Sequence, residues 1–410
     1  MSQAPVERFR VTDLVKMEAE QAVAALLSRA VELSASDLFL LSDERYVTVS
    51  VRRLGTVEKL AVVSTEHGRQ MMAHVKALAN MDISERRRPA DGRWIHEVDG
   101  RKIDLRINTT PTLHGEDMAM RVWDHSAGLF GIEELGMSRP DLNKLLFMLN
   151  NPSGLILVTG PTGTGKTTTL YACMQFLNDG ARKINTLEDP VEYALDGVRQ
   201  SQVHTKIGLD FPELLRNVLR QAPDVVMIGE IRDEETAATA VRAANSGHLV
   251  LATLHAATAG AAVNSMLALR SPSYFLSGCL LGVVAQRLLR TLCPNCRQQY
   301  DISSSPQTFQ EIEPLLGPDE GQAIYGPGSC EACYHVGYMG RTGLFEIMTV
   351  NQEIRRLIEE TATSQIIEQA AVRAGMLTFR RGALLKVAQG VTSTEEILRD
   401  VPADQLGLED

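Results

Sequence analysis

The residues between Thr159 and Tyr171 read TGPTGTGKTTTLY and contain the pattern G-x-x-x-x-G-K-T. Glycines at this spacing let backbone N–H groups approach phosphate oxygens, and the start of the following helix adds positive potential. In such a loop Lys166 reaches the outer phosphates and Thr167 holds a magnesium ion. The pattern therefore predicts a nucleotide site with Mg²⁺, formed by Gly160, Pro161, Thr162, Gly163, Thr164, Gly165, Lys166, Thr167 and Thr168.

Two glutamates stand at the ends of apolar runs. Glu188 lies in the run 183–189, and Glu230 ends the run 224–230. Because ligands bind at the carboxyl ends of parallel strands, we expect both side chains beside the phosphates. One carboxylate would orient the attacking water and the other would hold Mg²⁺. We favour Glu188 as the base, with a surface acid that caps the next turn as its alternative role. Glu230 would hold the metal through a water or act as the base itself.

Histidines and arginines add further candidates. His248 and His255 bracket the apolar run HLVLATLH. A lone histidine is more often a core residue whose ring nitrogens are hydrogen-bonded within the protein. This pair flanks a strand that should end at the phosphates, so we predict that the two histidines sense the γ-phosphate or a neighbouring subunit. Arg106 and Arg121 are either solvated strand-face residues or a clamp that completes the site when the first domain closes on the second.

Four of the six cysteines form two C-x-x-C pairs, Cys293 with Cys296 and Cys330 with Cys333. In a reducing compartment such pairs indicate a metal before a disulfide, and four thiolates complete a tetrahedral Zn²⁺ site. A disulfide or unligated cysteines are the alternative. The remaining two, at 173 and 279, lie in apolar helical stretches and are expected in the core.

The composition excludes several classes of protein. No run of 18 uncharged apolar residues occurs, and the first residues, MSQAPVERFR, do not form a signal peptide, so we expect a soluble cytosolic protein. The net charge of −10 argues against a general nucleic-acid binder, and no direct contact with nucleic acid is expected.

The pattern of elements predicts an α/β fold with a parallel-rich sheet, because four continuous apolar runs alternate with helical patterns. A small α+β domain precedes it. We expect five segments: the α+β domain at 1–125, a glycine-containing hinge at 126–138, the nucleotide-binding core at 139–290, a four-cysteine subdomain at 291–340 and a helical region at 341–410.

Several motifs resemble those of the secretion-superfamily ATPases that drive type II secretion and type IV pilus assembly. NTLEDPVEY is similar to the aspartate box of that family. The stretch from LRNVLRQAPDVVMIGE to LVLATLHA resembles the Walker B and histidine boxes of the family. The segment DLRINTTPTLHGEDMAMRV resembles the segment that carries two arginines to the nucleotide. GYMGRTGLFEIM and GVTSTEEILRDV resemble its C-terminal signatures.

This resemblance implies a PAS-like first domain and a RecA-like P-loop motor that hydrolyses ATP, with the nucleotide in the cleft between a chain's own two domains. It further implies a homo-hexameric ring at the cytoplasmic face of the inner membrane. The ring works against an inner-membrane platform protein, and its strokes add pilin or pseudopilin subunits to a filament. The resemblance also supports Arg106 and Arg121 as nucleotide contacts.

The four-cysteine insertion resembles the assembly (extension) branch of the family and is absent from the retraction branch. Phe39, Leu41, Leu54 and Ala222 depart from residues common in the family. We expect the chain to lack the long extra N-terminal domain that docks many members on an inner-membrane anchor protein, so we leave this anchor open. The alternatives are a DNA-uptake or conjugation ATPase of the same superfamily and a non-hydrolysing ring scaffold or regulator.

Overall fold

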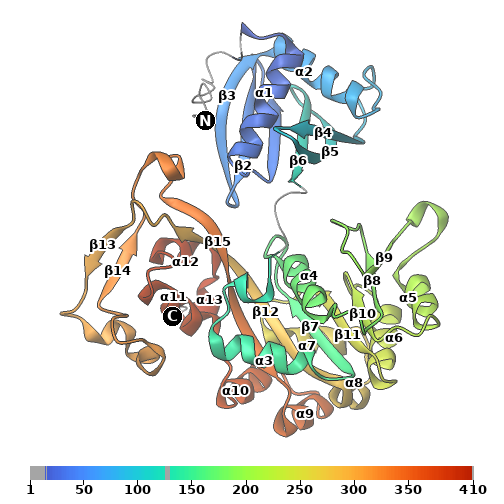
Figure 1. Ribbon diagram of the computed structural model, residues 1–410, viewed down its shortest axis with the longest axis vertical. Helices are drawn as coiled ribbons and strands as arrows, with labels where there is room; N and C mark the ends of the chain where they lie inside the picture. The colour runs from blue at the N-terminus through green and yellow to red at the C-terminus, as the bar shows by residue number, and fades with distance from the viewer. Residues whose placement is uncertain (1–13, 15, 125–129, 409–410) are drawn as a thin grey trace. The chain divides into compact units, whose positions relative to one another are not determined.

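The computed structural model describes residues 14, 16–124 and 130–408 and divides into two compact units, Met1–Gly128 and Leu129–Asp410 (Figure 1). Residues 126–129 of the expected hinge lie outside the described residues. The remainder of that segment contains a short 3₁₀ helix, η2 (Ile132–Leu135). None of the helices in the described part of the chain is long and apolar enough to cross a membrane.

The first unit is a six-stranded antiparallel sheet with two helices on one face. Its strands follow the order β3-β2-β1-β6-β5-β4. The helices are α1 (Ala19–Glu32) and α2 (Thr65–Leu78), and they bury Leu26, Met71 and Val75. The strands are β1 (Asp37–Ser42), β2 (Tyr46–Arg53), β3 (Thr56–Ser64), β4 (Ala90–Val98), β5 (Arg101–Thr112) and β6 (Gly115–Asp124).

The second unit contains a seven-stranded sheet in the order β15-β12-β7-β11-β10-β8-β9. All pairs are parallel except β12 with β15. The four predicted strands are confirmed, and so is the α/β fold with a parallel-rich sheet. The strands are β7 (Gly154–Thr159), β8 (Ile184–Glu188), β9 (Arg199–Gln202), β10 (Val225–Ile228), β11 (Leu249–Leu254), β12 (Leu280–Leu292) and β15 (Tyr338–Thr349).

Helices cover both faces of this sheet, as a buried parallel sheet requires. On one face Ile156, Val158 and Met227 pack against α3 (Arg139–Leu149) and α4 (Lys166–Leu177). Ser138 caps α3, since its hydroxyl accepts from the N–H of Asp141. The other face carries α5 (Phe211–Leu219), α6 (Glu234–Asn245), α7 (Ala259–Ala268), α8 (Ser273–Cys279), α9 (Gln352–Glu359), α10 (Ser364–Arg373) and α11 (Phe379–Ala388).

The C-terminal region differs from the expectation of helices throughout 341–410. It begins inside β15, whose second half is buried beside β12, and only then continues into helices. The expected boundary at 290/291 also falls inside a strand, β12. The region ends with α12 (Thr394–Asp400) and α13 (Ala403–Leu406).

The insertion between β12 and β15 forms its own small sheet. β13 (Gln298–Asp301) pairs antiparallel with β14 (Ala323–Gly326). Two 3₁₀ helices accompany it, η4 (Pro306–Leu315) and η5 (Glu331–Cys333). Phe309 and Ile312 of η4 are buried in the same core as Phe379 of α11, so the insertion packs on the C-terminal helices.

Candidate nucleotide and metal sites

The phosphate loop joins the end of β7 to the start of α4, which is the strand–loop–helix arrangement that the motif requires. Gly160, Gly163 and Gly165 all have positive φ. A Cβ on Gly160 would lie 2.4 Å from the carbonyl oxygen of Gln286, so only glycine fits there. The geometry therefore agrees with a loop that presents backbone N–H groups to a phosphate.

Lys166 begins α4 and lies over the loop. Its Nζ donates to the carbonyl oxygens of Gly160, at 2.7 Å, and Pro161, at 3.0 Å. Burial lowers the pKa of Lys166, and the negative charge of Glu230 partly opposes that shift. Glu230 is thus close enough to Lys166 for its negative charge to influence the pKa of this lysine. Thr167 is exposed at the start of the helix, so its hydroxyl and the Glu230 carboxylate offer the oxygen ligands that Mg²⁺ prefers.

Glu230 belongs to a charged cluster at the carboxyl edge of the sheet. His255 Nε2 lies 2.9 Å from Glu230 Oε1, and Arg232 Nε donates to Oε2 at 2.7 Å. Arg232 also lies 3.9 Å from a carboxylate oxygen of Asp189. The hydrogen bond that Arg232 donates to Glu230 raises the pKa of Arg232. The structure therefore brings together Lys166, Glu230 and His255, as the strand-end argument predicted.

Glu188 is oriented differently. Its side chain ends β8 on the sheet face that α4 covers, and only 3% of the residue is exposed. The hydroxyls of Tyr171 and Thr186 donate to it, and Gln200 Nε2 donates at 3.1 Å. Burial and Glu188 raise the pKa of Tyr171, which therefore stays a neutral donor. The carboxylate is thus committed to a buried hydrogen-bond network, and its role as the base stays a prediction.

His248 does not lie at the phosphate site of its own chain, so that part of the prediction is wrong. The residue precedes β11, whose six residues at about 3.3 Å each separate it from the carboxyl edge by roughly 20 Å. Its Nδ1 lies 3.0 Å from the carbonyl oxygen of Ala243, and its own carbonyl accepts from Gly154 at the start of β7. His248 and His255 lie at opposite ends of β11, so only His255 lies at the carboxyl edge of the sheet. An inter-subunit role for His248 stays a prediction.

Arg106 and Arg121 lie directly opposite each other on β5 and β6 of the first unit. Residues opposite each other in an antiparallel pair share one face, here the face without α1 and α2. The Arg121 side chain is 60% exposed, and its Nε lies 3.4 Å from an Asp37 carboxylate oxygen. The two arginines are therefore cross-strand neighbours, and the clamp stays a prediction.

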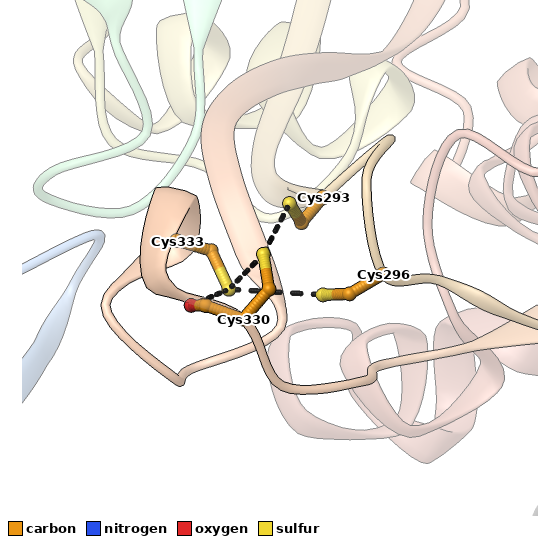
Figure 2. Close-up of side chains that lie close together, drawn as sticks. All are labelled: Cys293, Cys296, Cys330 and Cys333. Carbon is orange, nitrogen blue, oxygen red and sulfur yellow. Dashed lines mark hydrogen bonds between the residues drawn. The ribbon is translucent and has the colours of Figure 1, made fainter.

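The four cysteines of the two C-x-x-C pairs converge on one point (Figure 2). Cys293 follows β12 directly, and Cys330 and Cys333 precede β15. The Sγ–Sγ distances are 3.8 Å for Cys293–Cys330 and 3.7 Å for Cys296–Cys333 and Cys330–Cys333. A tetrahedral Zn²⁺ with Zn–S bonds of about 2.3 Å places its sulfurs about 3.8 Å apart. The four thiols thus have the donor set and spacing of a structural zinc site.

A hydrogen bond from the backbone around the four cysteines is also compatible with a bound metal. The backbone N–H of Gly337 donates to Cys333 Sγ at 3.2 Å, an outer contact typical of a bound thiolate. All six cysteines are free thiols in the structure. Cys173 and Cys279 are buried in the apolar cores, as expected.

Comparison with known proteins shows which family has this architecture. The sequence profile of the family described as "Type II/IV secretion system protein" matches residues 15–399. The chain belongs to this family. It is 40% identical over 380 residues to "Type II secretion system ATPase E" of Vibrio cholerae, covering 92% of this chain and 74% of that protein. It is 41% identical over 377 residues to "Type II secretion system protein HxcR" of Pseudomonas aeruginosa, covering 92% and 76%.

Two solved structures have a similar fold. A crystal structure of the pilus retraction motor PilT with bound ADP matches with a TM-score of 0.60 and 26% identity, over 92% of this chain and 96% of that one. The ATPase DotB of Legionella pneumophila matches with a TM-score of 0.67, over 97% and 96% of the two chains. At 18% identity the DotB likeness shows the fold alone.

Sequence reasoning on this type II/IV secretion system protein missed three polar residues of the site. Arg232 follows Glu230 by two positions and pairs with it. Tyr171, at the end of the quoted loop motif, contacts Glu188. Gln286 interrupts the apolar stretch of β12 and contacts the phosphate loop. The break that Gln286 makes in an apolar run is the only signal that the sequence offered.

Proposed function

We propose that this chain is an ATP-hydrolysing motor of a type II secretion or type IV pilus assembly system. The observation that carries the proposal is the meeting of Lys166, Glu230 and His255 at the carboxyl edge of a parallel sheet. The printed activity of the Vibrio cholerae relative, an ATPase of type II secretion, supports the same reading. Family membership over nearly the whole chain makes the assignment specific to secretion motors.

Each residue of the site has a separate role in the proposed phosphoryl transfer. Backbone N–H groups of the loop bind the phosphates, and Lys166 neutralises charge on the outer ones. Thr167 and Glu230 would hold Mg²⁺, which supplies positive charge to the phosphate oxygens when bound. As the alternative to holding the metal, Glu230 beside His255 would orient or deprotonate the attacking water. Arg106 and Arg121 would stabilise the charge that develops on the transferred group.

The proposed assembly and its surroundings rest on membership of the family. We propose that six copies form a ring at the cytoplasmic face of the inner membrane. Its partner is an inner-membrane platform protein, and its product is an extended pilus or pseudopilus. The cysteine cluster would hold one structural Zn²⁺ per chain and fix the insertion between β12 and β15.

A steady-state phosphate-release assay on the full chain tests the proposal. Wild-type protein should hydrolyse Mg-ATP, and Lys166→Ala should reduce release to background while the protein remains folded. Lys59→Ala is the matched control, because this lysine is exposed on β3 of the first unit. Equal turnover in wild type and Lys166→Ala, or no turnover in wild type, would contradict the proposed activity.

A further inference from the structure

Gln286 is a buried polar residue of β12 that faces the phosphate loop. Only 2% of it is exposed. Side chains alternate along a strand, so Val284 and Gln286 point to the face that α3 and α4 cover. Val284 packs in the apolar core of that face. Gln286 lies one step further along the strand, where the core gives way to the loop.

The side-chain amide of Gln286 connects two separate parts of the nucleotide-binding segment. Its Nε2 donates to the carbonyl oxygen of Thr164 at 2.7 Å. Its Oε1 accepts from the hydroxyl of Thr169 at 2.8 Å. Thr164 lies inside the loop, and Thr169 lies in the first turn of α4. One buried side chain therefore fixes both ends of the four residues between them.

This bond orients a peptide unit that matters for phosphate binding. In a planar trans peptide the carbonyl and the following N–H point in opposite directions. Because the Thr164 carbonyl points at Gln286, the N–H of Gly165 points away from β12. That N–H is among the groups that the loop pattern offers to a phosphate. The backbone carbonyl of Gln286 also lies so close to Gly160 that the chain there must be glycine.

We propose that Gln286 is a positioning residue for nucleotide binding, which holds the phosphate loop in its binding conformation without touching the nucleotide. The inference rests on the proposed ATPase function and extends it to a residue outside the loop motif. Preorganised N–H groups bind phosphate more tightly than groups that must first be ordered. Loss of the amide should therefore weaken nucleotide binding before it affects the fold.

The test compares Gln286→Ala with Val284→Ala. Val284 lies on the same strand and face, and its apolar side chain packs in the core rather than donating to the loop backbone. Binding of a fluorescent ATP analogue with Mg²⁺ is measured by titration, and unfolding temperature is measured with and without nucleotide. Gln286→Ala should weaken binding about tenfold, the effect of one or two neutral hydrogen bonds. Its nucleotide-induced rise in unfolding temperature should shrink accordingly. Val284→Ala should bind as wild type even where its nucleotide-free unfolding temperature falls.

Two further variants keep the test decisive if Gln286→Ala does not fold. Gln286→Glu keeps the shape and can accept from Thr169, but it cannot donate to Thr164 and should also bind weakly. Thr169→Val removes the other hydrogen bond, and its effect should be non-additive with that of Gln286→Ala. Wild-type affinity in folded Gln286→Ala or Gln286→Glu would overturn the proposal. Failure of wild type itself to bind nucleotide would instead contradict the proposed function.

Discussion

Replacing Glu230 by Gln removes one negative charge and keeps the size of the side chain. Against the burial that lowers the pKa of Lys166, the negative charge of Glu230 raises it, and Glu230 Oε1 lies 2.9 Å from His255 Nε2. We therefore expect hydrolysis to depend on Glu230 more than on Glu188. Loss of a general base commonly lowers a rate by about 10²–10⁴-fold, and kcat should fall at least about 100-fold. The partners Arg232 and His255 have side chains 61% and 49% exposed. Free energy of unfolding should therefore change by less than about 1 kcal/mol.

Replacing Glu188 by Gln should give the opposite pattern. The buried carboxylate accepts from Tyr171, Thr186 and Gln200, whereas a glutamine offers a single acceptor oxygen. The new amide group would also face the Gln200 amide, donor against donor. A buried donor left without an acceptor costs about 1–3 kcal/mol, so the free energy of unfolding should fall by that amount. The kcat of the folded fraction should fall by less than about tenfold.

Phosphate release at saturating Mg-ATP and urea unfolding, each measured on both variants, separate these two patterns. The reasoning predicts an inactive, stable Glu230→Gln and an active, less stable Glu188→Gln. A stable Glu188→Gln with at least a 100-fold loss of kcat, together with near-normal turnover in Glu230→Gln, would refute it. Glu188 would then be the base that the sequence favoured.

Three other predictions concern the metal, the pH dependence and the arginines. Metal analysis of protein prepared without chelator should find about one zinc per chain, and Cys293→Ser with Cys296→Ser should release it; zinc-free wild type would contradict the site. Burial raises the pKa of Glu346 to about 7, so its stabilising contribution is complete below about pH 4.5 and is lost as the pH rises through 7. Unfolding measured from pH 5 to 8 should show a smaller loss of stability in Glu346→Gln than in wild type; equal losses would argue against it. Rings mixed from Lys166→Ala and Arg121→Ala chains should stay inactive if the arginine acts within its own chain, and recovered ATPase activity would show action between chains.

The fold was predictable where burial is continuous along the sequence. β7, β10 and β11 are buried at every position, so their continuous apolar runs predict them as strands. β15 was missed because its residues 339–341 are exposed and its partner β12 lies far back in the chain. β9 was missed because the edge strand RQSQ carries no apolar residue. Local patterns report burial, and pairing between distant segments leaves no local pattern.

The site was predictable to the same extent. Lys166 comes from a motif, and the meeting of Glu230 with His255 follows from the rule that parallel strands share a carboxyl edge. The error on His248 arose from treating both ends of one strand alike. Gln286 reaches the loop only because β12 pairs with β7, a neighbour about 120 residues earlier in the chain. Which side chains support a loop depends on such pairings, and one sequence does not contain them.

The carboxyl-edge loops are also joined to one another, which constrains how the site can work. The N–H of Ala256 donates to the Thr159 hydroxyl at 2.8 Å, which ties the segment after His255 to the end of β7. The Thr253 hydroxyl donates to the carbonyl of Gly229, beside Glu230. These bonds connect the backbone segments that carry His255 and Glu230 with the end of β7, where the phosphate loop begins. Preorganisation by such bonds is what lets fixed charges stabilise a transition state without reorganising at the moment of reaction.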